Sequence, residues 1–111
     1  MNSIQELFQK KDKNLLSIYF TSGYPKLDDT ARIIQKLSKS TVDFIEVGLP
    51  YSDPLADGPT IQDSSQKALE NGINLDVIFQ QLMPLKETNK TPLVLMGYLN
   101  QLLKYGEEKF C

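Results

Sequence analysis

The chain has 111 residues, of which 41% are hydrophobic and 23% are charged, a composition typical of a globular protein and not of a disordered one. Its net charge is −2 and Arg32 is its only arginine, which argues against the dense basic surface that nucleic acids require. With one cysteine, Cys111, and no histidine, it lacks an intrachain disulfide, the usual metal ligand and the usual neutral-pH base.

The N-terminal segment predicts a short amphipathic helix. Ser3 and Glu6 have the spacing of a capping box, and Ile4, Leu7 and Phe8 supply a one-sided apolar stripe. Residues 1–14 contain no apolar signal-peptide region, and no later apolar run approaches the roughly 20 residues of a membrane span. We therefore expect a cytoplasmic protein.

The next segments predict a first strand and helix. Residues 15–20 are typical of a buried strand, and residues 21–25 of a turn. Residues 28–40 predict a helix with acids at its positive end, and we expect Ile33 and Leu37 to face inward.

The second unit combines a strand over residues 42–48 with a helix that starts near Thr60. The Thr60 hydroxyl is the expected cap, with Asp63 in a capping-box-like position, and Asn71-Gly72 ends the helix.

A further helix opens at Asn74 and should kink or end near Pro84. Residues 93–96 form a continuous apolar run, which predicts a strand buried on both faces, and residues 101–110 predict a last helix. Strands alternate with helices three times, so we expect an α/β fold with a parallel sheet and right-handed crossovers.

Glu46 interrupts an otherwise apolar strand. Because side chains alternate along a strand, Glu46 shares one face with Phe44 and Gly48, while Ile45 and Val47 should meet the helices. Parallel α/β proteins place ligands at the carboxyl ends of their strands, and Glu46 lies near that end of its strand. The alternative is a structural glutamate held by a lysine or by backbone amides.

The segment after this strand, residues 49–59, contains three prolines and two further acids, Asp53 and Asp57. It is longer than the roughly 2–6 residues typical between a strand and its helix, and long ordered loops are often functional. For Asp57 an Asx-turn in the sequence Asp-Gly-Pro is a sufficient structural alternative.

Three further side chains are candidates for the wall of a pocket. Tyr19 and Tyr98 lie at or near the ends of the first and third strands. Met96, on the third strand, is expected to face the same central space as these tyrosines. Ordinary core packing is the alternative for all three. No glycine-rich phosphate loop occurs, so nucleotide binding has no support.

The sequence of residues 45–62, Ile-Glu-Val-Gly-Leu-Pro-Tyr-Ser-Asp-Pro-Leu-Ala-Asp-Gly-Pro-Thr-Ile-Gln, resembles the signature of the tryptophan synthase alpha subunit family. Residues 20–25 and 92–100 resemble the family's first turn and third strand. The resemblance implies a (β/α)8 TIM barrel, a carbon-carbon lyase of tryptophan biosynthesis that cleaves indole-3-glycerol phosphate to indole and glyceraldehyde 3-phosphate. Residues 1–111 would form a single incomplete domain, about three βα units with an extra N-terminal helix.

By this resemblance, Glu46 matches the catalytic glutamate, which moves protons as indole C3 gains one and the glycerol hydroxyl loses one. Asp57 matches the aspartate that binds the indole N–H. Tyr19, Met96 and Tyr98 match substrate-binding positions in the pocket wall.

The resemblance also implies a partner, the beta subunit of an alpha2beta2 complex. Tyr51, Ser52, Asp53, Pro54 and Asn100 would face it. No cofactor and no metal is expected in this chain, because pyridoxal phosphate belongs to the beta subunit.

A complete barrel needs about 250 residues and usually binds phosphate after strands seven and eight. We therefore expect a partial sequence, ending inside a helix at Cys111, that is inactive alone. Two alternatives stay open: a non-catalytic fragment that binds the beta subunit through its proline-rich loop, and another phosphate-binding barrel lyase.

Overall fold

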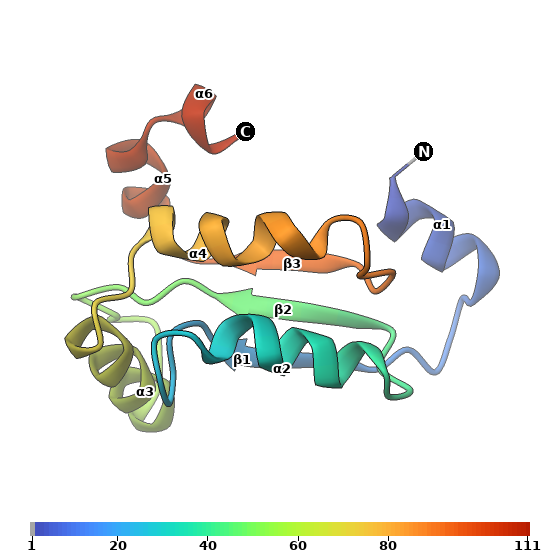
Figure 1. Ribbon diagram of the computed structural model, residues 1–111, viewed down its shortest axis with the longest axis horizontal. Coiled ribbons are helices and arrows are strands. Elements are labelled where there is room, and N and C mark those ends of the chain that lie inside the picture. Colours follow the sequence, from blue (N-terminus) through green and yellow to red (C-terminus); the bar gives the residue numbers. More distant parts are fainter. Residues whose placement is uncertain (1) are drawn as a thin grey trace.

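The computed structural model describes residues 2–111 as one parallel sheet with strand order β1-β2-β3 and helices in between (Figure 1). The strands are β1 (Ser17–Thr21), β2 (Phe44–Gly48) and β3 (Leu93–Met96). The helices are α1 (Ser3–Lys10), α2 (Asp29–Ser38), α3 (Pro59–Glu70), α4 (Leu75–Leu82), α5 (Leu99–Tyr105) and α6 (Glu107–Phe110), and η1 (Met83–Leu85) is a single 3-10 turn. The predicted α/β order and parallel pairing are confirmed.

The main core lies between the sheet and the helices α2 and α4, which share one side of it (Figure 1). Ile45 and Val47 of β2 are fully buried there, as the alternation predicted. On α2 the central residue is Ile34, which is fully buried, with Leu37 packed beside it. Ile33 and Leu37, both predicted to face inward, are both half-buried, and of the two it is Leu37 that packs against this core.

A second core fills the space beneath α3 and α4. Leu49, Ala68, Ile73 and Ile78 are its buried members. The α4 helix ends at Leu82 and Pro84 lies in η1, so the predicted early end near that proline is confirmed.

The two predicted N-terminal caps are wrong. In α1 the cap is Asn2, whose Oδ1 accepts the Gln5 N–H at 2.9 Å while Gln5 Oε1 accepts the Asn2 N–H at 3.0 Å. The capping box therefore begins one residue before Ser3. The α3 helix begins at Pro59 behind Gly58, with no side-chain cap, so the Thr60 hydroxyl does not cap it.

The expectation that β3 is buried on both faces is also wrong. Leu93, Val94 and Leu95 are half-buried, and Met96 is 49% exposed. Within residues 2–111 β3 pairs only with β2, so one of its edges has no neighbouring strand. A continuous apolar run indicates burial in a complete sheet, which this part of the chain does not provide by itself.

The turn after β1 is fastened to its neighbours by side-chain hydrogen bonds. Ser22 donates from its hydroxyl to the Gly48 carbonyl at 2.6 Å, and the Gly23 N–H donates to Thr30 Oγ1 at 2.9 Å. Asn71, at the end of α3, donates its amide to the Gly23 carbonyl at 3.0 Å. The carboxyl ends of β1 and β2 are thereby held together.

Helix α1 lies at the opposite, amino-terminal end of the strands (Figure 1). It is attached there through Asp43, which accepts the Leu16 N–H at 2.7 Å and forms an ion pair with Lys11 at 3.2 Å. The Leu16 N–H, and then Lys11, lower the pKa of the Asp43 carboxyl below its ordinary value.

We expect Ile34→Ala to lower the free energy of unfolding by about 2–5 kcal/mol, because it opens a cavity in the main core. The matched control is Ile33→Ala, one position along the same helix, which should have a clearly smaller effect. Urea unfolding measures both, and equal effects would contradict the position assigned to Ile34.

Asp43→Asn should lower stability at neutral pH. A carboxyl whose pKa is depressed by folding stabilises the protein above its unfolded pKa, and this contribution is lost as the pH falls through the folded value. The difference in urea midpoint between the two proteins should therefore shrink below about pH 3.8. The exposed control Asp12→Asn should change the urea midpoint at neutral pH much less than Asp43→Asn does.

Candidate active site

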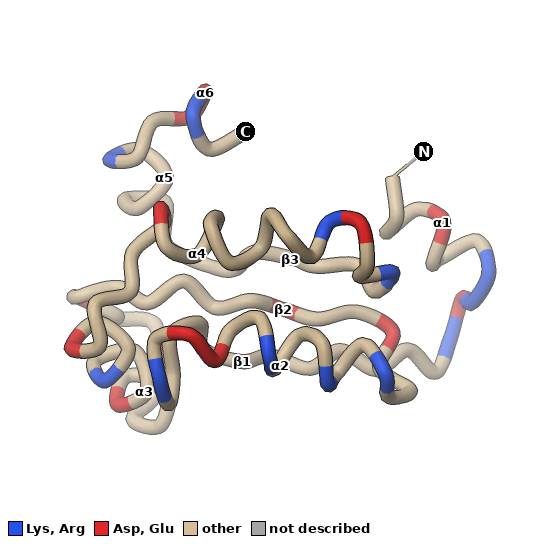
Figure 2. The backbone as a smooth tube through the Cα atoms, in the orientation of Figure 1, with Lys and Arg blue, Asp and Glu red and all other residues tan. Residues whose placement is uncertain are grey.

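Glu46 is the single charged residue of the three strands and lies in the middle of β2 (Figure 2). Its register partners are Tyr19 on β1 and Val94 on β3, so it points to the face opposite the α2/α4 layer. Glu46 is half-buried, and its Oε1 accepts the Ser17 hydroxyl at 2.8 Å. Among residues 2–111 no lysine or arginine pairs with it, so the structural alternative of a lysine-held glutamate finds no support.

Tyr19 crosses the same face next to Glu46. Its hydroxyl oxygen and ring occupy the space above Gly48, where any side chain on Gly48 would overlap them. Burial raises the pKa of the Tyr19 phenol, and the charges of Asp57 and Glu46 raise it further, whereas Thr21 lowers it. The phenol therefore lies within electrostatic reach of both predicted catalytic acids.

Asp57 is held by a residue from a distant part of the chain. Its Oδ2 accepts the Tyr98 hydroxyl at 3.1 Å, and the Tyr98 oxygen accepts the Ala56 N–H at 3.0 Å. Within the described residues the hydrogen bond to the Asp57 side chain comes from Tyr98 and not from a nearby backbone N–H, so the Asx-turn alternative does not describe it. Burial raises the pKa of the Tyr98 phenol, and Asp57 adds to the rise, whereas the Ala56 N–H opposes it.

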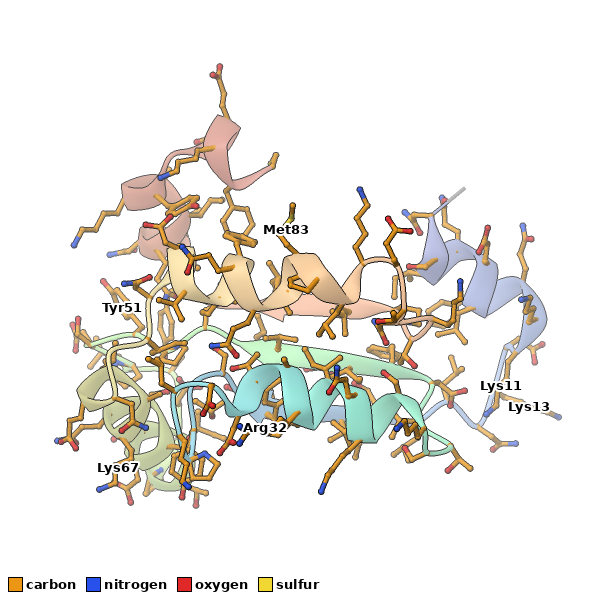
Figure 3. All side chains as sticks on the ribbon, viewed as in Figure 1. Lys11, Lys13, Arg32, Tyr51, Lys67 and Met83 are labelled. Carbon is orange, nitrogen blue, oxygen red and sulfur yellow. The ribbon has the colours of Figure 1, made fainter. Side chains whose placement is uncertain are left out.

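Tyr51 connects this site to an open groove. Its ring stacks on Tyr98 with centroids 5.0 Å apart and an interplanar angle of 25°, and it lies between α3 and α5 (Figure 3). The groove, of about 650 Å³, is lined by Tyr51, Ser52 and Asn100 among others. Of the other predicted interface residues, Asp53 is exposed and Pro54 is half-buried in the same loop.

The structure places Met96 beside Gly48 in register, on the Glu46 face as predicted, although half of its surface is exposed. Two residues of the site were not predicted: Ser17, which binds Glu46, and Gln101, whose amide donates to the Pro50 carbonyl at 2.8 Å. The only available signal for Ser17 was its position two residues before Tyr19 on the same face.

No group of three or more metal-ligating side chains occurs among residues 2–111. In the same part of the chain, every helix is too short or too polar to cross a membrane.

The three parallel βα units, with Glu46 on the second strand and Asp57 in the loop that follows it, match successive units of a (β/α)8 barrel protein. The family described as tryptophan synthase alpha chain matches residues 5–111, and the chain belongs to this family. The family and the barrel architecture implied by the sequence resemblance are confirmed.

Relatives and solved structures agree with this membership. The chain is 58% identical over 111 residues to the tryptophan synthase alpha chain of Flavobacterium psychrophilum, covering 100% of this chain and 44% of that protein. The tryptophan synthase subunit alpha of Legionella pneumophila superposes with a TM-score of 0.92 at 37% identity, over 99% of this chain and 44% of that one. An aminoacrylate-bound form of Mycobacterium tuberculosis tryptophan synthase gives a TM-score of 0.86 at 30% identity, over 99% and 46%. The chain thus spans less than half the length of these proteins.

Gly48→Ala should destabilise the chain by about 1–3 kcal/mol, because the new methyl group and the Tyr19 ring cannot share the same space. In a Tyr19→Ala background the same change should have a much smaller additional effect. Urea unfolding of the four proteins in this cycle measures the coupling, and strict additivity would contradict the close approach of the two residues.

Proposed function

We propose that the complete protein containing this chain cleaves indole-3-glycerol phosphate into indole and glyceraldehyde 3-phosphate by a retro-aldol reaction. The observation that carries the proposal is the placement of Glu46, the single charge on the three strands, on the sheet face that the α2/α4 layer leaves open. Family membership supports the reaction class.

In this reaction the bond between indole C3 and the adjacent glycerol carbon breaks. Glu46 delivers a proton to C3 and accepts one from the hydroxyl on the glycerol carbon, which becomes the aldehyde, so protons and electrons balance. Asp57 stays ionised, accepts the indole N–H and stabilises the positive charge of the indolenine-like intermediate. Each acid accepts one hydroxyl, Glu46 from Ser17 and Asp57 from Tyr98, but Glu46 lies on a strand and Asp57 in a loop. Such different surroundings can give two carboxyl groups different tasks.

Residues 1–111 supply, in this proposal, a single incomplete domain of three βα units. The substrate's phosphate group requires loops that follow the last strands of such barrels. We therefore propose that the 111-residue chain alone does not turn over the substrate. Tyr19, Tyr98 and Met96 contribute to the wall of the indole pocket.

The proposed partner is a tryptophan synthase beta subunit in an alpha2beta2 complex of the cytoplasm, where that subunit carries the pyridoxal phosphate and this chain carries no cofactor. The groove beside Tyr51, Ser52 and Asn100 supports this position for the partner, as do the neighbouring Asp53 and Pro54. The likeness to the Mycobacterium tuberculosis structure is further support.

A second candidate is a non-catalytic chain that only docks on a beta subunit through residues 50–58. The observation that favours it is the exposure of this loop, in which Leu55 is 83% exposed. Titration of the 111-residue chain with a beta subunit, followed by an assay for indole release, separates binding without lysis from catalysis.

The catalytic role of Glu46 can be tested in a completed chain, in which residues 1–111 are joined to the remaining C-terminal residues of the Flavobacterium psychrophilum relative. Glu46→Gln should lower kcat for indole release by about 10²–10⁴-fold, because the amide cannot transfer a proton. The exposed Glu87→Gln is the matched control and should keep full activity. A Glu46→Gln variant that retains a near-normal rate would remove the catalytic assignment.

A further inference from the structure

The Tyr98 hydroxyl has a fixed orientation. Its oxygen accepts the Ala56 N–H at 3.0 Å, which occupies one side of the oxygen. The hydroxyl proton is therefore directed to its other neighbour, Asp57 Oδ2, at 3.1 Å. A phenol that donates to a carboxylate while accepting from a backbone N–H has its donor and acceptor directions both defined.

The backbone and ring of Tyr98 are fixed as well. Gln101 accepts the Tyr98 N–H at 2.9 Å through Oε1 and donates through Nε2 to the Pro50 carbonyl at 2.8 Å. Tyr51 stacks on the ring. The start of α5 is therefore bound to the segment that follows β2 by hydrogen bonds and by ring stacking. Tyr98 cannot rotate without breaking these contacts.

The Asp57 carboxylate is used on one side only. Within residues 2–111 its side-chain hydrogen bond involves Oδ2 and comes from Tyr98, so Oδ1 is left to accept a donor from a ligand. An ionised carboxylate accepts on both oxygens, and fixing one oxygen also fixes the direction of the other.

We propose that Tyr98 is a positioning residue, which holds Oδ2 of Asp57 so that Oδ1 is presented to the ring N–H of the substrate. This inference rests on the proposed function of Asp57 and adds to it the division of labour between the two carboxylate oxygens. The Tyr98 hydroxyl acts through Asp57 and makes no contact with the reacting carbon atoms.

The kinetic test uses the completed chain without a beta subunit. Tyr98→Phe removes only the hydroxyl and should lower kcat/KM by about tenfold, because the carboxylate loses its orientation. Tyr105→Phe is the matched control, since it removes a phenol-to-aspartate hydrogen bond of the same length, 3.1 Å to Asp76. It should change kcat/KM by less than about twofold.

A substrate analogue gives a readout that general destabilisation would not change. In the benzofuran analogue of indole-3-glycerol phosphate an oxygen replaces the ring N–H, so no donor meets Oδ1. Without the nitrogen lone pair this analogue does not form the indolenine-like intermediate, so the comparison is one of dissociation constants, measured for both ligands in a Glu46→Gln background that turns the natural substrate over slowly. The loss of affinity caused by Tyr98→Phe with the natural substrate should be absent with this analogue. A loss of equal size for both ligands, or none for either, overturns the proposal.

A titration tests the interaction between Tyr98 and Asp57 and does not require the protein to be catalytically active. In the completed chain with ¹³C-labelled tyrosine, the Tyr98 phenol should titrate above its ordinary value, and Asp57→Asn should lower its pKa because a neighbouring negative charge is lost. Asp57→Asn should leave the Tyr105 phenol unchanged, whereas Asp76→Asn should lower its pKa. A Tyr98 pKa insensitive to Asp57→Asn overturns the inference even when the chain is inactive, whereas inactivity with an intact response counts against the proposed function alone.

Discussion

The burial of Ile45 and Val47 against α2 and α4 is the interaction on which the rest of the site depends. Because side chains in a strand alternate between two faces, these two contacts force Glu46 onto the opposite face. A shift of one residue in the pairing of β2 would bring the carboxylate into the core and expose both aliphatic side chains, which is costly on both counts. The hydrophobic core thus determines the direction of the proposed proton donor, with no polar contact needed to specify the face.

The side chains of Glu46 and Asp57 are oriented by different kinds of contact. Glu46 is oriented by the strand that carries it and needs only the Ser17 hydroxyl beside it. Asp57 lies in an irregular loop, where the backbone alone does not specify the direction of a side chain, and its orientation comes from Tyr98 at the end of β3. One acid is oriented by its strand and the other by a distant side chain. This difference fits a reaction in which Glu46 exchanges protons and Asp57 keeps its charge.

The sequence predicted the features that depend on local patterns. Alternation in β2 was sufficient to assign the face of Glu46, and the lack of an N–H in Pro84 was sufficient to end α4. Features that depend on distant residues were missed. The bond between Tyr98 and Asp57 joins positions 41 residues apart, and no periodicity reports it. The choice of Asn2 over Ser3 as a cap was missed because both residue types accept the same hydrogen bond.

Among residues 2–111, helix α3 is connected by side-chain hydrogen bonds to β1 and the turn after it, and not to the α2/α4 layer. Thr21 at the end of β1 shares a hydroxyl contact of 2.8 Å with Ser64, and Asn71 bonds the carbonyls of Gly23 and Pro25. Hydrogen bonds of this kind make the connected segments unfold together when the structure opens locally. Amide protons in the middle of α3 should consequently exchange with solvent in step with those of β1, even though α2 separates the two elements along the chain.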